Sequence, residues 1–213
     1  LYNITGPQIS ISDAAGHIYK LVEYKNSVYG ACLDGLTEYD YFGNIFFPKN
    51  TLNEIKEELS FIDKDPYGNL WLQSNKNDLI MFTVEGNDTI IKYIDEEDGL
   101  PGIERLYFFN YSDKFYFSTD KGLFVYDHEN RKIIPETELD PELNKLLINI
   151  NRFIPDGNGS VYISKRSEGF DDIYRLGHKE TGALVVDSIT FKRLPQMKTR
   201  AIYPDEGGNV WLS

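Results

Sequence analysis

The sequence has little cysteine, few basic residues and no long apolar run. Cys32 is the only cysteine among the 213 residues, which excludes a disulfide within the chain and a zinc site built from cysteines. No run of about 18 apolar residues occurs, so no segment is predicted to span a membrane. Lys and Arg total 22 against 34 Asp and Glu, a formal net charge of −12. This acidity argues against a nucleic-acid partner, because phosphate binding requires clustered basic side chains.

Metal ions and cofactors are also not predicted. His17, His128 and His178 are isolated from one another and fall in or beside different turns, so they indicate neither a shared metal site nor a catalytic histidine. The acidic run over 95–98 lacks the ligand spacing of a known calcium loop and is interpreted as a solvated charge run. Carboxylates are so numerous that no glycosidase pair can be singled out.

A short phrase is repeated along the chain. An acidic residue lies six positions before an aromatic residue, and a glycine lies three positions before it. The complete copies are Asp65 to Trp71 with Gly68, Asp156 to Tyr162 with Gly159, and Asp205 to Trp211 with Gly208. Degenerate copies end at Tyr29, with Glu23 and Asn26, and at Tyr116, with Asn110 and Asp113. The five aromatic anchors are therefore 42, 45, 46 and 49 residues apart, a period typical of β-propeller blades.

The residue types in the phrase indicate a β-hairpin turn. An Asp at the head of a turn can accept a bond from the backbone two residues on, and glycine three before the aromatic can adopt positive φ. A second turn follows each anchor after six or seven residues, and a third turn comes before a short apolar run. Each unit thus holds four strands joined by three turns, as a propeller blade does. The second turn is marked by Gly35, Asn77, Gly122 and Gly169.

The fold class predicted is an all-β propeller fragment with about four and a half blades of four antiparallel strands. We predict one partial propeller domain over 1–213, with blades near 16–48, 59–94, 103–135, 150–188 and, incomplete, 199–213. At roughly 46 residues a blade, a seven-bladed ring needs about 320 residues. We therefore expect a piece of a larger, seven-bladed propeller that associates with further copies; a closed five-bladed ring is the alternative. Short helices are expected within 50–59 and 140–147.

The anchors Tyr29, Trp71, Tyr116, Tyr162 and Trp211 recur at one offset in every blade. Such recurrence favours aromatic packing between blades over sugar stacking. Three arginines are better candidates for ligand binding. Arg105, Arg152 and Arg200 precede their anchors by 11, 10 and 11 residues, near the start of the innermost strand, and together could bind a carboxylate or sulfate. The alternative is that each pairs with a neighbouring acid.

The sequence resembles the two-component regulator propeller repeat. The resemblance rests on the stretch from Ile62 to Ser74, the connector Glu97-Asp-Gly-Leu-Pro101 and the stretch from Ser118 to Asp127. It departs from the repeat where Tyr replaces Trp and where Ser or Gln replaces the Gly-Thr pair. The resemblance implies the periplasmic sensor region of a hybrid two-component histidine kinase, in which propellers precede an immunoglobulin-like domain, the membrane helix and the kinase, and the ligands are often oligosaccharides.

We therefore predict a non-catalytic, ligand-sensing propeller whose partners are an oligosaccharide and the remaining receptor domains. Two alternatives stay open. A propeller glycoside hydrolase or polysaccharide lyase would release new reducing ends or unsaturated products from polysaccharides. A protein scaffold propeller would bind proteins and no small ligand.

Overall fold

The computed structural model describes residues 10–11, 17–42, 45–86, 88–167, 169–178, 184–193, 198–199, 201–205 and 207–213. The fold is an all-β propeller, which confirms the fold class expected from the repeats. The chain forms two compact units. Unit 1 contains Leu1–Gly102, Asn110–Phe115 and Tyr126–Ile133, and unit 2 contains Ile103–Phe109, Tyr116–Val125 and Ile134–Ser213.

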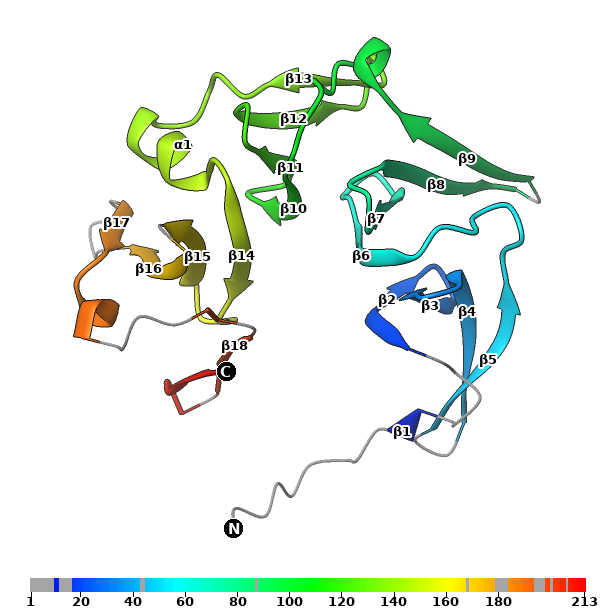
Figure 1. The fold of residues 1–213 in the computed structure, drawn as a ribbon, viewed down its shortest axis with the longest axis horizontal. Coiled ribbons are helices and arrows are strands. Elements are labelled where there is room, and N and C mark those ends of the chain that lie inside the picture. The colour runs from blue at the N-terminus through cyan, green and yellow to red at the C-terminus, as the bar shows by residue number, and fades with distance from the viewer. Residues whose placement is uncertain are drawn as a thin grey trace. The chain divides into compact units, whose positions relative to one another are not determined.

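Four sheets each contain four consecutive antiparallel strands (Figure 1). Sheet one is formed by β2 (Ile18–Tyr24), β3 (Ser27–Cys32), β4 (Gly35–Phe42) and β5 (Ile45–Thr51), and the short β1 (Ser10–Ile11) pairs with β5 in parallel. Sheet two contains β6 (Leu59–Lys64), β7 (Leu70–Ser74), β8 (Leu79–Glu85) and β9 (Asp88–Ile94). Sheet three contains β10 (Leu106–Tyr111), β11 (Lys114–Thr119), β12 (Leu123–Asp127) and β13 (Lys132–Pro135).

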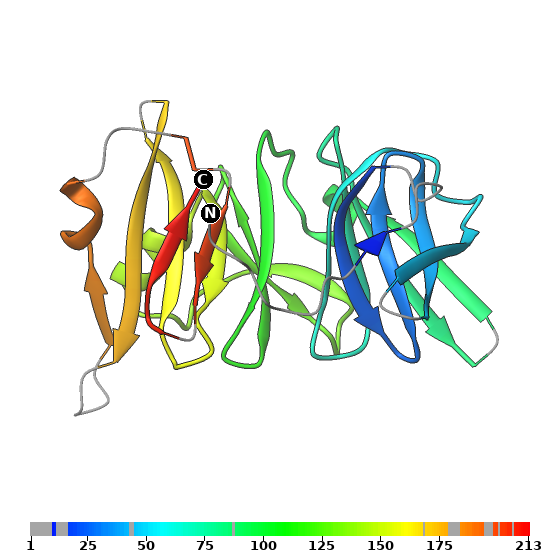
Figure 2. The same cartoon turned by 90° about the horizontal axis from the view of Figure 1, so that it is seen from below.

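Sheet four is formed by β14 (Ile150–Pro155), β15 (Val161–Ser167), β16 (Phe170–His178) and β17 (Leu184–Asp187). A fifth, two-stranded sheet contains β18 (Ile202–Pro204) and β19 (Val210–Leu212), and within unit 2 this hairpin lies beside β14 (Figure 2). Helical segments are short and lie between sheets: η2 (Glu96–Asp98), α1 (Pro141–Leu147) and η3 (Thr190–Arg193).

One of the two helices expected from the sequence is present. Asp140 caps α1 by accepting the N–H groups of Glu142 and Leu143, and Pro141 occupies the first turn. The helix expected within 50–59 is wrong. Asn50 and Thr51 instead extend β5, where they pair with Glu38 and Thr37 of β4, so strand pairing outweighs the capping signal.

The repeated phrase forms a five-residue turn between the first and second strands of sheets two, four and five. In the first copy the Asp65 carboxylate accepts the N–H groups of Tyr67 and Asn69, the Asn69 side chain and the Trp71 indole N–H, at 2.7 to 3.0 Å. Gly68 three residues before the aromatic has a φ of 90°, and Gly159 and Gly208 have φ of 86° and 80°. Each turn is therefore closed by its own acid.

The two degenerate copies form a different turn, which offset counting alone did not reveal. β2 and β3 are joined by the two residues Lys25 and Asn26, and β10 and β11 by Ser112 and Asp113. Positive φ falls on Lys25 (54°) in the first turn and on both Ser112 (48°) and Asp113 (62°) in the second. A two-residue hairpin needs such left-handed residues, and it places Glu23 and Asn110 within strands. Asn110 consequently donates its side-chain N–H to the Lys64 carbonyl of sheet two, at 2.8 Å.

Sheets one and two of unit 1 share an apolar core. Its fully buried members include Leu36, Leu59 and Ile62, and the Tyr24 hydroxyl donates to the Gly68 carbonyl at 2.9 Å while accepting the Val84 N–H. The full cluster contains Tyr24, Ala31, Leu36, Ile55, Leu59, Ile62, Leu70, Leu72, Ile80 and Phe82. Tight packing also explains Gly35, because a Cβ there would lie 2.1 Å from the Ile55 carbonyl oxygen.

The aromatic anchors lie on the second strand of each sheet. Trp71 is fully buried, with ring centroids 5.6 Å from Phe115 and 5.0 Å from Tyr126 of sheet three. Tyr29 lies 5.6 Å from Phe82 of sheet two. In unit 2, Tyr116 and Tyr162 are also buried, the latter against Ile202 of β18. Trp211, in contrast, is 56 % exposed.

Candidate functional site

The predicted ligand-binding arginines belong to the part of the chain that forms unit 2. Arg105 lies in the connection just before β10, and Arg152 lies inside β14, where it follows a bulge and pairs with Ser164 of β15. Arg200 lies outside the described residues. The same bulge occurs in the first strands β2 and β6, just before Lys20 and Phe61. Arg152 therefore occupies the position that directly follows the bulge in each of these three first strands.

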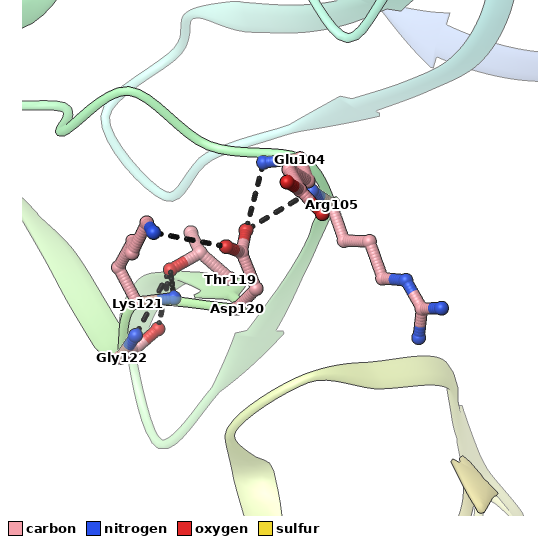
Figure 3. Close-up of polar contacts among 6 residues, drawn as sticks. All are labelled: Glu104, Arg105, Thr119, Asp120, Lys121 and Gly122. Atoms are coloured by element: carbon pink, nitrogen blue, oxygen red, sulfur yellow. Dashed lines mark hydrogen bonds and ion pairs between the residues drawn. The ribbon is translucent and has the colours of Figure 1, made fainter. Parts of the chain in front are cut away.

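The backbone at Arg105 is fixed by an acid from a neighbouring turn. Asp120 accepts the N–H groups of Glu104 and Arg105 through one carboxylate oxygen, at 2.9 and 3.1 Å, and its other oxygen lies 3.7 Å from the Lys121 ammonium. Figure 3 shows the exposed Arg105 side chain extending away from Asp120. Asp120 therefore positions the backbone that carries Arg105 and leaves the guanidinium to other contacts.

The turn that carries Asp120 is itself well ordered by hydrogen bonds. The Thr119 hydroxyl accepts the N–H groups of Lys121 and Gly122 and donates to the Gly122 carbonyl (Figure 3). Partial burial acts to raise the pKa of the Asp120 carboxyl, but the N–H donors of Arg105 and Glu104 outweigh it, so the pKa is lowered. The carboxylate thus stays charged over the neutral pH range.

Arg152 is half-buried on one face of sheet four. One guanidinium N–H donates to the Asn151 carbonyl at 2.8 Å. Because paired residues in an antiparallel sheet share a face, Arg152 lies on the same face as Ser164, and the alternation along β15 adds Arg166. Arg166 pairs with Asp171 of β16, which completes the set. We call Arg152, Ser164, Arg166 and Asp171 the polar half of sheet four.

Asp171 organises this polar half. Its side chain is 1 % exposed, and one carboxylate oxygen accepts the Asn151 side-chain N–H at 2.9 Å and lies 3.5 Å from Arg166 Nε. The other oxygen accepts the N–H of Thr199, in the connection that leads to β18, at 2.6 Å. The buried Asp171 carboxylate thus links β14, β15 and the connection to the next sheet. Two of the residues that Asp171 binds, Asn151 and Thr199, are the chain neighbours of Arg152 and of position 200.

Most of the remainder of the same face is apolar, although Arg175 of β16, which pairs with Tyr162, also lies on it. Ile154, Tyr162 and Ile173 continue the face along the three strands and pack against Ile202 of β18. The β18–β19 hairpin packs against these apolar residues, and the polar half is the other part of the face. Asp171, Ser164 and Thr199 were not predicted from the sequence, because none of them belongs to the repeated phrase.

No group of three or more His, Cys, Asp or Glu side chains in the described ranges is arranged to hold a metal ion. The Cys32 thiol is buried beside the Tyr39 hydroxyl at 3.2 Å, and burial raises its pKa, which disfavours the reactive thiolate. No helix within the described part of the chain is long and apolar enough to cross a membrane.

Solved structures with the same fold are similar to nearly the whole chain. An extracellular domain of BT4673 from B. thetaiotaomicron, described as part of a hybrid two component system, shares 18 % identity over 94 % of this chain and 32 % of its own, with a TM-score of 0.56. The extracellular domain of BT3049 from the same organism, described in the same way, shares 17 % identity over 92 % of this chain and 25 % of its own, with a TM-score of 0.54.

An enzyme shares the fold as well. A catalytically inactive virginiamycin B lyase from Staphylococcus aureus has 14 % identity over 92 % of this chain and 62 % of its own, with a TM-score of 0.53. No protein-family model and no curated protein matches the sequence. The chain spans about a quarter to a third of the two extracellular domains that it matches. At sequence identities this low, the structural likeness establishes the β-propeller fold alone.

Proposed function

We propose that this propeller is a non-catalytic, ligand-sensing module in the extracytoplasmic part of a two-component signalling receptor, and that its ligand is an oligosaccharide. The observation that carries the proposal is the match of more than nine-tenths of the chain to extracellular domains described as parts of hybrid two component systems. The resemblance of the repeats to the two-component regulator propeller supports the same role and a periplasmic location. The remaining receptor domains are then its partners, and the kinase activity belongs to the parent receptor.

A ligand can signal only if it favours one receptor arrangement over another. In the proposed mechanism an oligosaccharide binds the propeller and shifts the equilibrium between two arrangements of a dimeric receptor. Binding to the folded state also raises stability by mass action, by about 2.7 kcal/mol at a hundredfold excess over the dissociation constant.

A thermal-shift screen against neutral and acidic oligosaccharides tests the proposal, and product analysis of the same mixtures tests the enzyme alternative, which the lyase neighbour keeps open. A selective rise in melting temperature without new reducing ends or unsaturated products is the expected result. New products would replace the sensor by an enzyme. Stabilisation by no saccharide would favour a protein-binding scaffold.

A further inference from the structure

One bulge residue of sheet one makes a different contact from its counterparts in the other sheets. The first strands β2, β6 and β14 each leave one residue unpaired at the bulge, namely Tyr19, Ser60 and Asn151. Ser60 and Asn151 donate to acceptors within their own sheets. The Tyr19 hydroxyl instead donates to Glu58, in the connection between sheets one and two, at 2.6 Å. A bulge can re-aim a side chain, and here it directs an aromatic ring toward this connection.

The ring of Tyr19 is not part of the common architecture of the blades. Polar residues without a ring occupy the equivalent bulges of sheets two and four, and the Tyr19 ring is 51 % exposed, so it adds little to the apolar core. Its position is nevertheless fixed, because a short hydrogen bond to a carboxylate belongs to the stronger class. Tyr19 therefore presents a fixed apolar surface with a polar tip to solvent, as suits packing against the C–H face of a sugar ring.

Glu58 connects Tyr19 to a third residue. Its second carboxylate oxygen accepts the Asn75 side-chain N–H at 2.6 Å, and its carbonyl accepts the Asn75 backbone N–H at 2.9 Å. Asn75 directly follows β7 and is exposed. A carboxylate oxygen can accept a second hydrogen bond, and an Asn side chain also offers its carbonyl oxygen. An aromatic ring, a carboxylate and an amide from three segments of unit 1 are thus held at one surface position.

The charge at this position favours an uncharged ligand. Both donors to the Glu58 carboxylate are neutral, so its negative charge is retained. The neighbouring cation, Lys20, pairs with Asp63 at 2.9 Å and lies 4.1 Å from the centre of the Phe61 ring. A uronate or a sulfated sugar would bring a second negative charge beside Glu58, which like-charge repulsion disfavours. Sugar hydroxyls, in contrast, can donate short and strong hydrogen bonds to a carboxylate.

Resting on the oligosaccharide sensor proposed above, we infer that Tyr19, Glu58 and Asn75 form a subsite that binds one uncharged pyranose residue of the oligosaccharide. The Tyr19 ring packs against the apolar face of the sugar. Glu58 accepts a hydrogen bond from one sugar hydroxyl, and Asn75 pairs with the adjacent hydroxyl through its amide. We call these three residues the Tyr19 subsite.

Calorimetric titration of the full chain tests the inference, with cellobiose, mannobiose, galactobiose and xylobiose as neutral probes and digalacturonate as the acidic probe. A neutral disaccharide is expected to bind roughly tenfold more tightly than digalacturonate. Tyr19→Ala is expected to weaken that binding by roughly tenfold, because the stacking surface is lost. Glu58→Gln is expected to weaken it by roughly three- to tenfold, since a charged acceptor becomes neutral, and to reduce the preference over digalacturonate.

Tyr93→Ala is the matched control. Tyr93 is 47 % exposed, and its hydroxyl also donates to a carboxylate, that of Glu57, at 2.9 Å. It lies on β9, the last strand of sheet two, and not at a bulge of a first strand. Tyr93→Ala is expected to leave the affinity unchanged. Both tyrosine variants are expected to keep the melting temperature of the parent chain, as surface substitutions usually do.

Every other result overturns the inference in a recognisable way. A disaccharide that binds Tyr19→Ala as tightly as the parent chain removes the Tyr19 subsite and leaves the oligosaccharide sensor standing, and so does an equal loss of affinity in Tyr93→Ala. Tighter binding of digalacturonate than of the neutral disaccharides removes the uncharged ligand. Failure of every saccharide to bind removes both the subsite and the oligosaccharide of the proposed function.

Discussion

Trp71 and Trp211 occupy the same position in two copies of one phrase, and only one of them is buried. Both indoles donate to the acid six residues earlier, Trp71 to Asp65 at 2.8 Å and Trp211 to Asp205 at 2.9 Å. Trp71 is fully buried against Phe115 and Tyr126, whereas Trp211 is 56 % exposed. Hydrogen bonding within the hairpin is thus independent of burial, and burial depends on the sheet that packs alongside.

The comparison separates two sources of stability in this fold. The acid, the turn and the indole form a local unit that is complete in both of these hairpins. The apolar gain comes only when another sheet covers the aromatic ring, and it is the larger of the two, because a buried Trp contributes several kcal/mol and an exposed hydrogen bond contributes about 1 kcal/mol or less. Substitutions at matched positions can measure each source separately.

The largest contrast is expected between the two tryptophans themselves. Trp71→Ala should lower the free energy of unfolding by about 3–5 kcal/mol, because it leaves a cavity against Phe115 and Tyr126. Trp211→Ala should cost less than about 1 kcal/mol, as surface substitutions usually do. Urea unfolding followed by circular dichroism measures both. Equal losses would show that burial is not what separates the two copies.

Replacing the acids should give the next largest contrast. Asp65 is buried, and Asp65→Ala leaves four donors, including the indole N–H, without an acceptor. We expect a loss of about 3 kcal/mol for Asp65→Ala, since unsatisfied buried donors retain their desolvation cost. Asp205→Ala should cost clearly less, because water can replace the lost acceptor at an exposed turn. The comparison fails if Asp205→Ala destabilises as much in the same urea titration.

The turn glycines should show no contrast. Gly68 and Gly208 have φ of 90° and 80°, and an added Cβ would meet no atom within 4 Å at either position. Gly68→Ala and Gly208→Ala should therefore each cost about 1 kcal/mol, the strain of a positive φ alone. Thermal unfolding of the two variants measures the costs side by side. A much larger loss at Gly68 would mean that its carbonyl bond to Tyr24, and not the backbone conformation, dominates there.

The smallest effect is expected on acidification. The indole of Trp211 and the donors of Asn209 lower the pKa of Asp205 below its ordinary value of 3.8. A lowered pKa contributes stability that is present above the unfolded-state value and is lost as the pH falls through the folded-state value. In a Trp71→Phe background, the fluorescence of Trp211 should change with a midpoint below 3.8. A midpoint at or above this value would contradict the hydrogen bond.

The periodicity of the sequence was sufficient to predict the propeller fold, because each blade repeats the same local turn chemistry. Positive φ occurs at Gly35, Asn77, Gly122 and Gly169, the positions that mark the second turn. The number of blades in a complete ring and the single-domain boundaries stay predictions. Local patterns failed where loop length changed, as at the two-residue turn of Lys25 and Asn26.

The candidate site was less accessible to sequence reasoning. Arg105 and Arg152 were found by their offsets, but the structure places one before a strand and the other inside a strand. Asp171 binds Asn151 and Thr199, which lie 20 and 28 residues away and share no repeated motif with it. A contact of this kind follows from the packing of sheet four and its following connection, and periodicity carries no information about it.

The hydrogen bond between the acid and the indole also bears on how proteins built from such repeats evolve. Asp205 and Trp211 form their hydrogen bond even though the indole ring is largely exposed. A duplicated stretch of coding sequence would therefore encode a complete hydrogen-bonded turn. The duplicate would need only a new apolar contact on its open side, and not a new turn. The two-residue turns of sheets one and three show that a repeat can also have a different turn at this position and still form its blade.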